Sequence, residues 1–133
     1  MKKMNNKGFS LVELIIVIAI MAVLVGVLAP QFLKYVESSR VQKDESAAAE
    51  VLNATKIACS VESVYNAISN GTTVTAADNA QVTSTVGALQ NEIRLTVPDT
   101  IDYTSKLHNG HSYVVTVAIN ASNGTVNVTG AWN

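Results

Sequence analysis

The sequence predicts an α+β fold in which a long amino-terminal helix packs against a small antiparallel β-sheet head. Three observations support this class. Leu14 to Pro30 carry no charge, an apolar pattern at helical spacing follows them, and two alternating segments flank an Asn-Gly turn near the carboxyl terminus. With 133 residues, the chain has room for one small domain and an appendage.

The first helix is predicted from an apolar segment with basic residues ahead of it. Lys2, Lys3 and Lys7 precede the segment, so the positive-inside rule keeps them cytoplasmic and places the rest of the chain outside. Residues 9–33 are long enough to span a membrane only if Glu13 is tolerated within them. A carboxylate at membrane depth costs several kcal/mol unless it is paired, so Glu13 is a functional candidate.

Two simpler interpretations of this segment leave Glu13 unexplained. The first is a secretory signal peptide cut after the small residues Val27 to Ala29, although Pro30 is a poor residue to follow a cut. The second is a plain single-pass anchor. Either one accounts for the apolar residues and neither gives the carboxylate a role.

The stretch "KGFSLVEL", Lys7 to Leu14, closely resembles the processing site of type IV prepilins and pseudopilins. The resemblance implies that residues 1–8 are a leader, which a prepilin peptidase removes between Gly8 and Phe9 before methylating the new amino terminus. Glu13 then becomes the fifth residue of the mature chain. It is implied to neutralise the Phe9 amine of a neighbouring subunit, since two buried charges are tolerable when paired.

The same resemblance implies a bacterial pilus subunit, most directly a major pilin. Its expected partners are identical subunits, the prepilin peptidase, the assembly platform with its ATPase, and the cytoplasmic membrane before assembly. The expected final location is a surface filament for adhesion, motility or DNA uptake. A secretion or competence pseudopilin is the alternative within the family, and a membrane-anchored binding module that never polymerises is the alternative outside it.

Gly26 and Pro30 predict a weak point in the helix. Proline removes a backbone hydrogen bond and clashes with the preceding turn. We therefore expect residues 22–30 to loosen or extend when subunits assemble, as happens in many pilins. A rigid kink that never melts is the alternative.

The second half of the helix is predicted to run from residue 34 to residue 69 and to be amphipathic. Its apolar residues recur at alternating spacings of four and three, which places them on one helix face. The small alanines in this face favour close packing under a sheet over a coiled-coil seam. The predicted face consists of Ala47, Val51, Ala54, Ala58, Val61, Tyr65 and Ile68.

The head is predicted over residues 70–133. The segment from Thr72 to Thr85 is interpreted as a loop, with a short helical turn near residues 84–90. "EIRLTVP" is expected to form a strand ending at Pro98. "SYVVTVAI" and "TVNVTGAW" form the clearest hairpin, giving an antiparallel sheet of three or four strands.

The remaining chemistry-bearing residues give no expected active site, metal site or cofactor. Cys59 is interpreted as a small core residue. His108 and His111 are placed in a solvated loop, and the pair Asp99 and Asp102 gives only a weak calcium signal because no acidic residue follows it. We expect no enzyme and no direct nucleic-acid site, because no basic face stands out beyond the leader.

Overall fold

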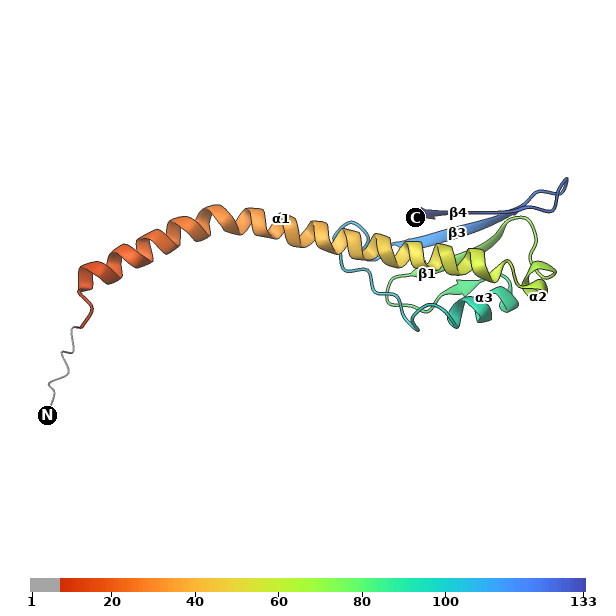
Figure 1. Cartoon of the computed structure of the whole chain (residues 1–133), viewed down its shortest axis with the longest axis horizontal. Coiled ribbons are helices and arrows are strands. Elements are labelled where there is room, and N and C mark those ends of the chain that lie inside the picture. Colours follow the sequence, from red (N-terminus) through yellow and green to blue (C-terminus); the bar gives the residue numbers. More distant parts are fainter. Residues whose placement is uncertain (1–7) are drawn as a thin grey trace, which may run out of the picture. The chain divides into compact units, whose positions relative to one another are not determined.

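The computed structural model describes residues 8–133 (Figure 1). The predicted leader, residues 1–8, therefore lies outside the described residues except for Gly8. The chain divides into two compact units, one extending through Val36 and the other spanning Glu37–Asn133.

The first unit consists of the amino-terminal part of helix α1, which spans Leu11–Ala58. From Leu11 to Tyr35 every residue is exposed. The helix continues through Pro30. Melting of residues 22–30 on assembly therefore remains a prediction about an assembled state.

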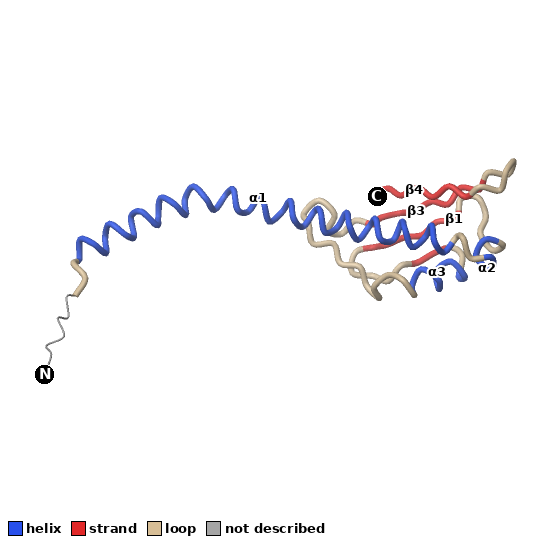
Figure 2. Tube along the Cα trace, in the orientation of Figure 1, coloured by secondary structure: helices blue, strands red, loops and turns tan. Residues whose placement is uncertain are grey.

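The second unit contains a four-stranded antiparallel sheet, as the sequence predicted (Figure 2). The strands are β1 (Thr72–Ala77), β2 (Thr83–Ser84), β3 (Ser112–Ile119) and β4 (Val126–Trp132), in the spatial order β2-β1-β3-β4. The β3–β4 hairpin confirms the clearest sequence prediction, with Val117 opposite Val128. The α+β class is therefore confirmed.

One face of this sheet packs against the carboxyl-terminal part of α1 and forms the core. Val74 of β1 and Val115 and Val117 of β3 are fully buried there, in one cluster with Val51 and Ala54 of α1. Small helix residues let the helix lie close to the sheet, which supplies the core that so small a sheet lacks alone.

The expectation of a helix reaching Ser69 is wrong, because α1 ends at Ala58. The amides of Ser60 and Val61 bond to carbonyls three residues back, at 2.9 and 3.0 Å, and Val61 takes an extended conformation. A short helix, α2 (Glu62–Tyr65), follows the turn. Val64 in α2 and Ile68 after it are buried. Buried apolar residues therefore continue past Ala58, although helix α1 does not.

The predicted loop from Thr72 to Thr85 is also wrong, since it contains β1 and β2. Its inward residues Thr72, Val74 and Ala76 alternate with half-buried residues. They are small or polar, which hides the strand period in the sequence. Pairing with β3 supplies the backbone partners that make this segment a strand.

The strand expected in "EIRLTVP" does not form, because residues 92–94 end a helix and residues 95–98 are a turn and an irregular segment. The helical turn predicted near residues 84–90 overlaps the start of that helix. Helix α3 spans Gly87–Arg94 and lies beside β2 and α2 (Figure 1). Leu89 and Ile93 are fully buried four residues apart, whereas Leu95 is 82% exposed. Helical spacing over Leu89 and Ile93 thus outweighs the alternation of Ile93, Leu95 and Val97 that suggested a strand.

Candidate processing and assembly site

The residues expected to be processed are accessible. Phe9 is 94% exposed, and a side chain added at Gly8 would meet nothing within 4 Å. Both residues precede the first turn of α1, which begins at Leu11. The peptide bond between Gly8 and Phe9 is therefore outside the helix, in the kind of segment that a peptidase can extend and cut.

Glu13 closes the amino terminus of its own helix. Its Oε2 accepts a hydrogen bond from the Ser10 amide at 2.8 Å, and the Ser10 carbonyl accepts the first helical bond from Leu14 at 3.2 Å. Ser10 is thus the N-cap and Glu13 the third helical residue, the carboxylate half of a capping box. An anion in the first turn is also favoured by the helix dipole.

This contact places the carboxylate one residue from the amine that a cut before Phe9 would create. Sequence reasoning assigned Glu13 a partner in a neighbouring subunit and missed its partner within the chain. The Ser-x-x-Glu spacing at the start of an apolar helix is the signal that could have revealed it.

The amino-terminal part of α1 has the length and composition of a membrane span. An 18-residue window reaches a mean hydropathy of 3.1, and none of that window is buried. Gly26 and Pro30 lie in this exposed part, where a side chain added at Gly26 would again meet nothing within 4 Å. The apolar surface has no partner among the described residues of its own unit.

The face predicted to lie under the sheet is only partly the buried one. Val51, Ala54, Ala58 and Ile68 are buried, Ala47 and Val61 are half-buried, and Tyr65 is 40% exposed. Its hydroxyl donates to the Gly124 carbonyl at 3.0 Å. The buried helix residues that the prediction missed are Asp44, Ala48 and Thr55.

Asp44 anchors a loop of the head to the helix. It is fully buried, and its two carboxylate oxygens accept hydrogen bonds from the amides of Thr104 and Ser105 at 3.0 and 2.9 Å. Burial by itself raises the pKa of Asp44, but the bonds from Ser105 and Thr104 outweigh it and hold that pKa below its ordinary value. A search for apolar spacing passes over such a residue because it is charged.

The expectation of a solvated His108 is wrong. Its side chain is buried and stacks on Trp132, with ring centroids 3.8 Å apart and planes within 7°. Its Nδ1 lies 3.7 Å from Asp44 and its Nε2 lies 3.5 Å from Glu45. Because Trp132 returns on β4, only the hairpin brings an aromatic plane to this loop; His111 stays exposed, as expected.

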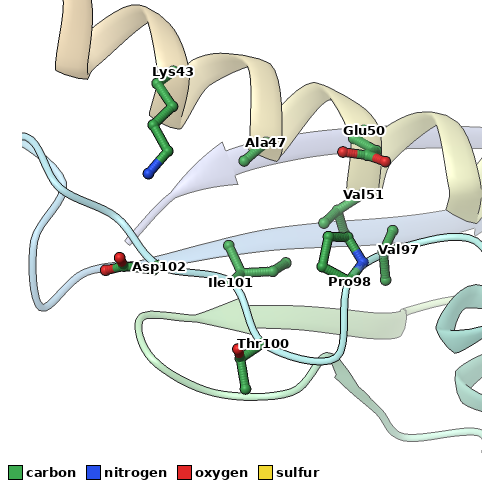
Figure 3. Close-up of a pocket in the computed structure, with 9 residues that line it drawn as sticks. All are labelled: Lys43, Ala47, Glu50, Val51, Val97, Pro98, Thr100, Ile101 and Asp102. Atoms are coloured by element: carbon green, nitrogen blue, oxygen red, sulfur yellow. The ribbon is translucent and has the colours of Figure 1, made fainter.

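A cavity of about 210 Å³ lies between α1 and the segment that follows α3 (Figure 3). Apolar side chains of Ala47, Val51 and Ile101 line it, and Lys43 and Asp102 are among its charged residues. Asp99 is exposed and does not line it. Within residues 8–133, no group of three or more His, Cys, Asp or Glu side chains could hold a metal ion.

The amino-terminal residues of the chain are similar to a known protein motif. Residues 3–29 match the sequence model of the prokaryotic N-terminal methylation motif. This is a type IV prepilin-like amino terminus. The match covers the residues around Gly8, Phe9 and Glu13 and leaves the head outside it.

A second similarity extends over most of the chain. Prepilin peptidase-dependent protein A of Clostridium perfringens (strain 13 / Type A) is 26% identical over 116 residues, which cover 86% of this chain and 81% of that protein. No solved structure matches the chain. The motif and this relative support a place among pilins and pseudopilins, and the apolar helix is consistent with membrane anchoring.

Proposed function

We propose that this chain is the major structural subunit of a bacterial type IV pilus-like filament. The single observation that carries the proposal is an exposed, apolar helix surface that lies largely within the methylation motif and contains one carboxylate, Glu13. Such a surface is satisfied either by lipid or by the same surface of other copies. A polymer is thus the arrangement that uses it outside the membrane.

In this proposal, the prepilin peptidase cuts between Gly8 and Phe9 and methylates Phe9. Before assembly the chain lies in the cytoplasmic membrane with its head outside. An assembly platform driven by an ATPase then inserts it into the filament. The name of the relative, which states dependence on a prepilin peptidase, supports the processing step.

Glu13 has two successive roles in the proposal. Before assembly it holds the Ser10 amide, at 2.8 Å, and keeps the start of the helix closed. During assembly it pairs with the Phe9 amine of a neighbouring subunit, which removes two unpaired charges from an apolar core at once. Loss of the carboxylate would leave that amine unpaired, at a cost of about 3–5 kcal/mol.

The first test is the intact mass and amino-terminal sequence of the native protein sheared from its own cells. We expect a chain that starts at Phe9, carries one additional methyl group and is abundant in the sheared fraction. A start at Met1 or near Pro30 would instead support the anchor or the secreted protein. A correctly processed chain that stays with the membrane, or is sheared off only in traces, would favour the pseudopilin.

A pair of variants separates the charge of Glu13 from its capping role. Glu13→Ala removes both, whereas Glu13→Gln keeps an acceptor for the Ser10 amide and loses the charge. We expect both variants to be processed and neither to make filaments. Normal fibres from Glu13→Gln would show that capping, and not charge pairing, is what assembly requires. Gly8→Asp is the processing control and should accumulate at full length.

A further inference from the structure

The sheet has two edges that differ in how they are protected. At one edge, β2 has two residues, and the Gln90 side chain of α3 accepts a bond from the Ser84 amide at 2.9 Å. At the other edge, β4 extends over seven residues at the border of the sheet (Figure 2). Among the described residues, nothing pairs with its outer side.

The register shows which backbone groups of β4 are free. Asn133 and Ser112 exchange both of their backbone bonds, at 2.9 and 3.4 Å, and Asn120 donates to Thr125 at 2.9 Å. Bonded pairs recur every second residue in an antiparallel ladder, so Asn127, Thr129 and Ala131 bond to β3. The amides and carbonyls of the alternate residues therefore point outward; these are Val126, Val128, Gly130 and Trp132.

The free edge also lacks the features that keep such edges apart. No Asp, Glu, Lys or Arg follows Lys106 in the sequence, and β4 contains no proline. Natural sheets usually block an exposed edge with a lysine, a proline or a bulge. Here Val126, Val128 and Trp132 are half-buried along the edge, so part of their apolar surface stays open to a neighbour.

The outer face of the sheet beside this edge is neutral too. Thr73, Thr116 and Thr129 lie in register across β1, β3 and β4, and Thr75, Val114 and Ala131 form the next row. Without residues 1–8, six basic and ten acidic side chains remain, so two copies of the chain carry net charge of the same sign. The β4 edge and the face beside it are where two copies can approach without bringing like charges together.

We infer that β4 is a self-association site that pairs antiparallel with β4 of a second copy. The register that joins all four outward residues places Val126 opposite Trp132 and Val128 opposite Gly130 of the other copy. The two-fold axis then passes through Thr129. Two four-stranded sheets become one continuous sheet, and the half-buried Val126 gains the partner's Trp132 as a neighbour.

The pairing has a consequence for polarity, which rests on the proposed function. Within the second unit, α1 and β4 lie lengthwise along one axis and run in opposite directions (Figure 1). A two-fold axis perpendicular to the sheet sets the two helices in opposite directions. Subunits of one helical polymer share a single polarity. The contact therefore joins two filaments side by side and is not the contact that builds one filament.

The test is a disulfide across the two-fold axis in the full-length chain in detergent micelles. Thr129 faces Thr129 of the partner as a pair without backbone bonds, with Cα atoms about 4.5 Å apart. That spacing suits a disulfide. Thr116→Cys is the matched control, because Thr116 lies on the same face one strand further in, and the two copies of it would be about 14 Å apart.

We expect mild oxidation to convert most of Thr129→Cys to a covalent dimer. Thr116→Cys should stay at the level of the wild type, whose only cysteine is the buried Cys59. Equal and low yields from the two variants would overturn the inference. Since Thr129 and Thr116 are both exposed, neither substitution removes a core contact.

A mixed sample tests the antiparallel register. Asn127 faces Ala131 of the partner, so Asn127→Cys and Ala131→Cys should cross-link to each other and neither should cross-link to itself. Self-linking of Ala131→Cys would indicate either parallel pairing or an antiparallel pair with its axis at Ala131, and would overturn the inferred pairing about Thr129.

Charge provides a readout without oxidation. Thr129→Lys places like charges directly opposite each other and should leave a monomer in sedimentation experiments. Mixing Thr129→Lys with Thr129→Glu should restore a dimer, whereas Thr116→Lys should not prevent one. In cells, Thr129→Lys should give normal numbers of filaments that no longer bundle. A loss of the filaments themselves would count against the proposed function, and persistent bundles would count against this contact.

Discussion

The two parts of helix α1 differ in where their side chains find partners. Between Leu11 and Tyr35 every residue is exposed, although the segment is almost entirely apolar. Between Glu37 and Ala58 the helix carries many charged residues, yet Asp44, Ala48, Val51 and Thr55 are among its buried ones. Burial in this chain thus follows the position of the sheet and not the hydrophobicity of the segment.

The difference indicates which part of the helix is complete in one copy. The carboxyl-terminal part has a sheet and an anchored loop from the same chain. The amino-terminal part is apolar on all sides, which is typical of a helix that another phase or other molecules surround. Substitutions should therefore act on head stability in one part and on membrane insertion or assembly in the other.

The largest expected effect is at Asp44. Asp44→Ala leaves the amides of Thr104 and Ser105 without their acceptor inside the head. Each such group costs about 1–3 kcal/mol, so we expect a loss of about 4 kcal/mol in the free energy of unfolding. Trp132, the only tryptophan, stacks on the adjacent His108 and reports unfolding by its fluorescence in urea.

Lys43→Ala is the control for this substitution, since Lys43 precedes Asp44 on the same helix and is exposed. It should change the stability by less than about 0.5 kcal/mol. Because the pKa of Asp44 is lowered in the folded state, its contribution is present above the unfolded pKa of about 3.9 and is lost as the pH falls through the folded value. The variant should lack that component of acid sensitivity.

An alkaline effect is expected from Tyr103. Burial, with further contributions from the nearby charges of Asp44 and Asp78, raises the pKa of Tyr103 to about 12, and its hydroxyl donates to the Ala76 carbonyl at 3.2 Å. The neutral phenol is thus favoured in the fold. Its contribution is complete below about pH 10 and is lost as the pH rises to about 12. The loss amounts to about 2–3 kcal/mol.

Tyr103→Phe should unfold with a weaker dependence on pH between 10 and 12 than the wild type. Urea unfolding at pH 8 and at pH 11.5 measures that difference. If wild type and variant lost equal stability over this interval, Tyr103 would not be the group responsible.

A matched pair of valines tests the comparison directly. Val51 is fully buried under the sheet, whereas Val23 in the amino-terminal part is 66% exposed. Val51→Ala should lower the free energy of unfolding of the head by about 2 kcal/mol, from lost transfer energy and the cavity left behind. Val23→Ala should leave it unchanged. A comparable loss from Val23→Ala would mean that the two parts of the helix are not independent.

The smallest effect is expected at the start of the helix. Glu13→Ala removes the acceptor of the Ser10 amide and should increase fraying of the first turn by about 0.5–1 kcal/mol. Hydrogen exchange of the Ser10 amide in micelles measures it. Glu13→Gln should keep most of the protection, and head unfolding should be the same in both variants.

The strands and the short helix of the head show which elements could be predicted from local sequence patterns. β3 and β4 have clear alternation and an Asn-Gly turn, which are local properties, so they were predicted correctly. β1 was assigned to a loop and the end of α3 to a strand, whereas the helical turn predicted near residues 84–90 overlaps the start of α3. β1 is a strand through its pairing with β3, and Ile93 is buried on a helix although its neighbours alternate.

The sequence by itself determined the position of Glu13, the length of the apolar segment and the α+β class. It also predicts that Gly8 and Phe9 are the processing residues. These are properties of neighbouring residues in the chain, so the local sequence is enough to predict them. Only the tertiary structure decided that Asp44 holds a loop about sixty residues away, that His108 stacks on Trp132, and that β4 is the unprotected edge. Each of these depends on segments that the fold brings together, and no local pattern records which segments will meet.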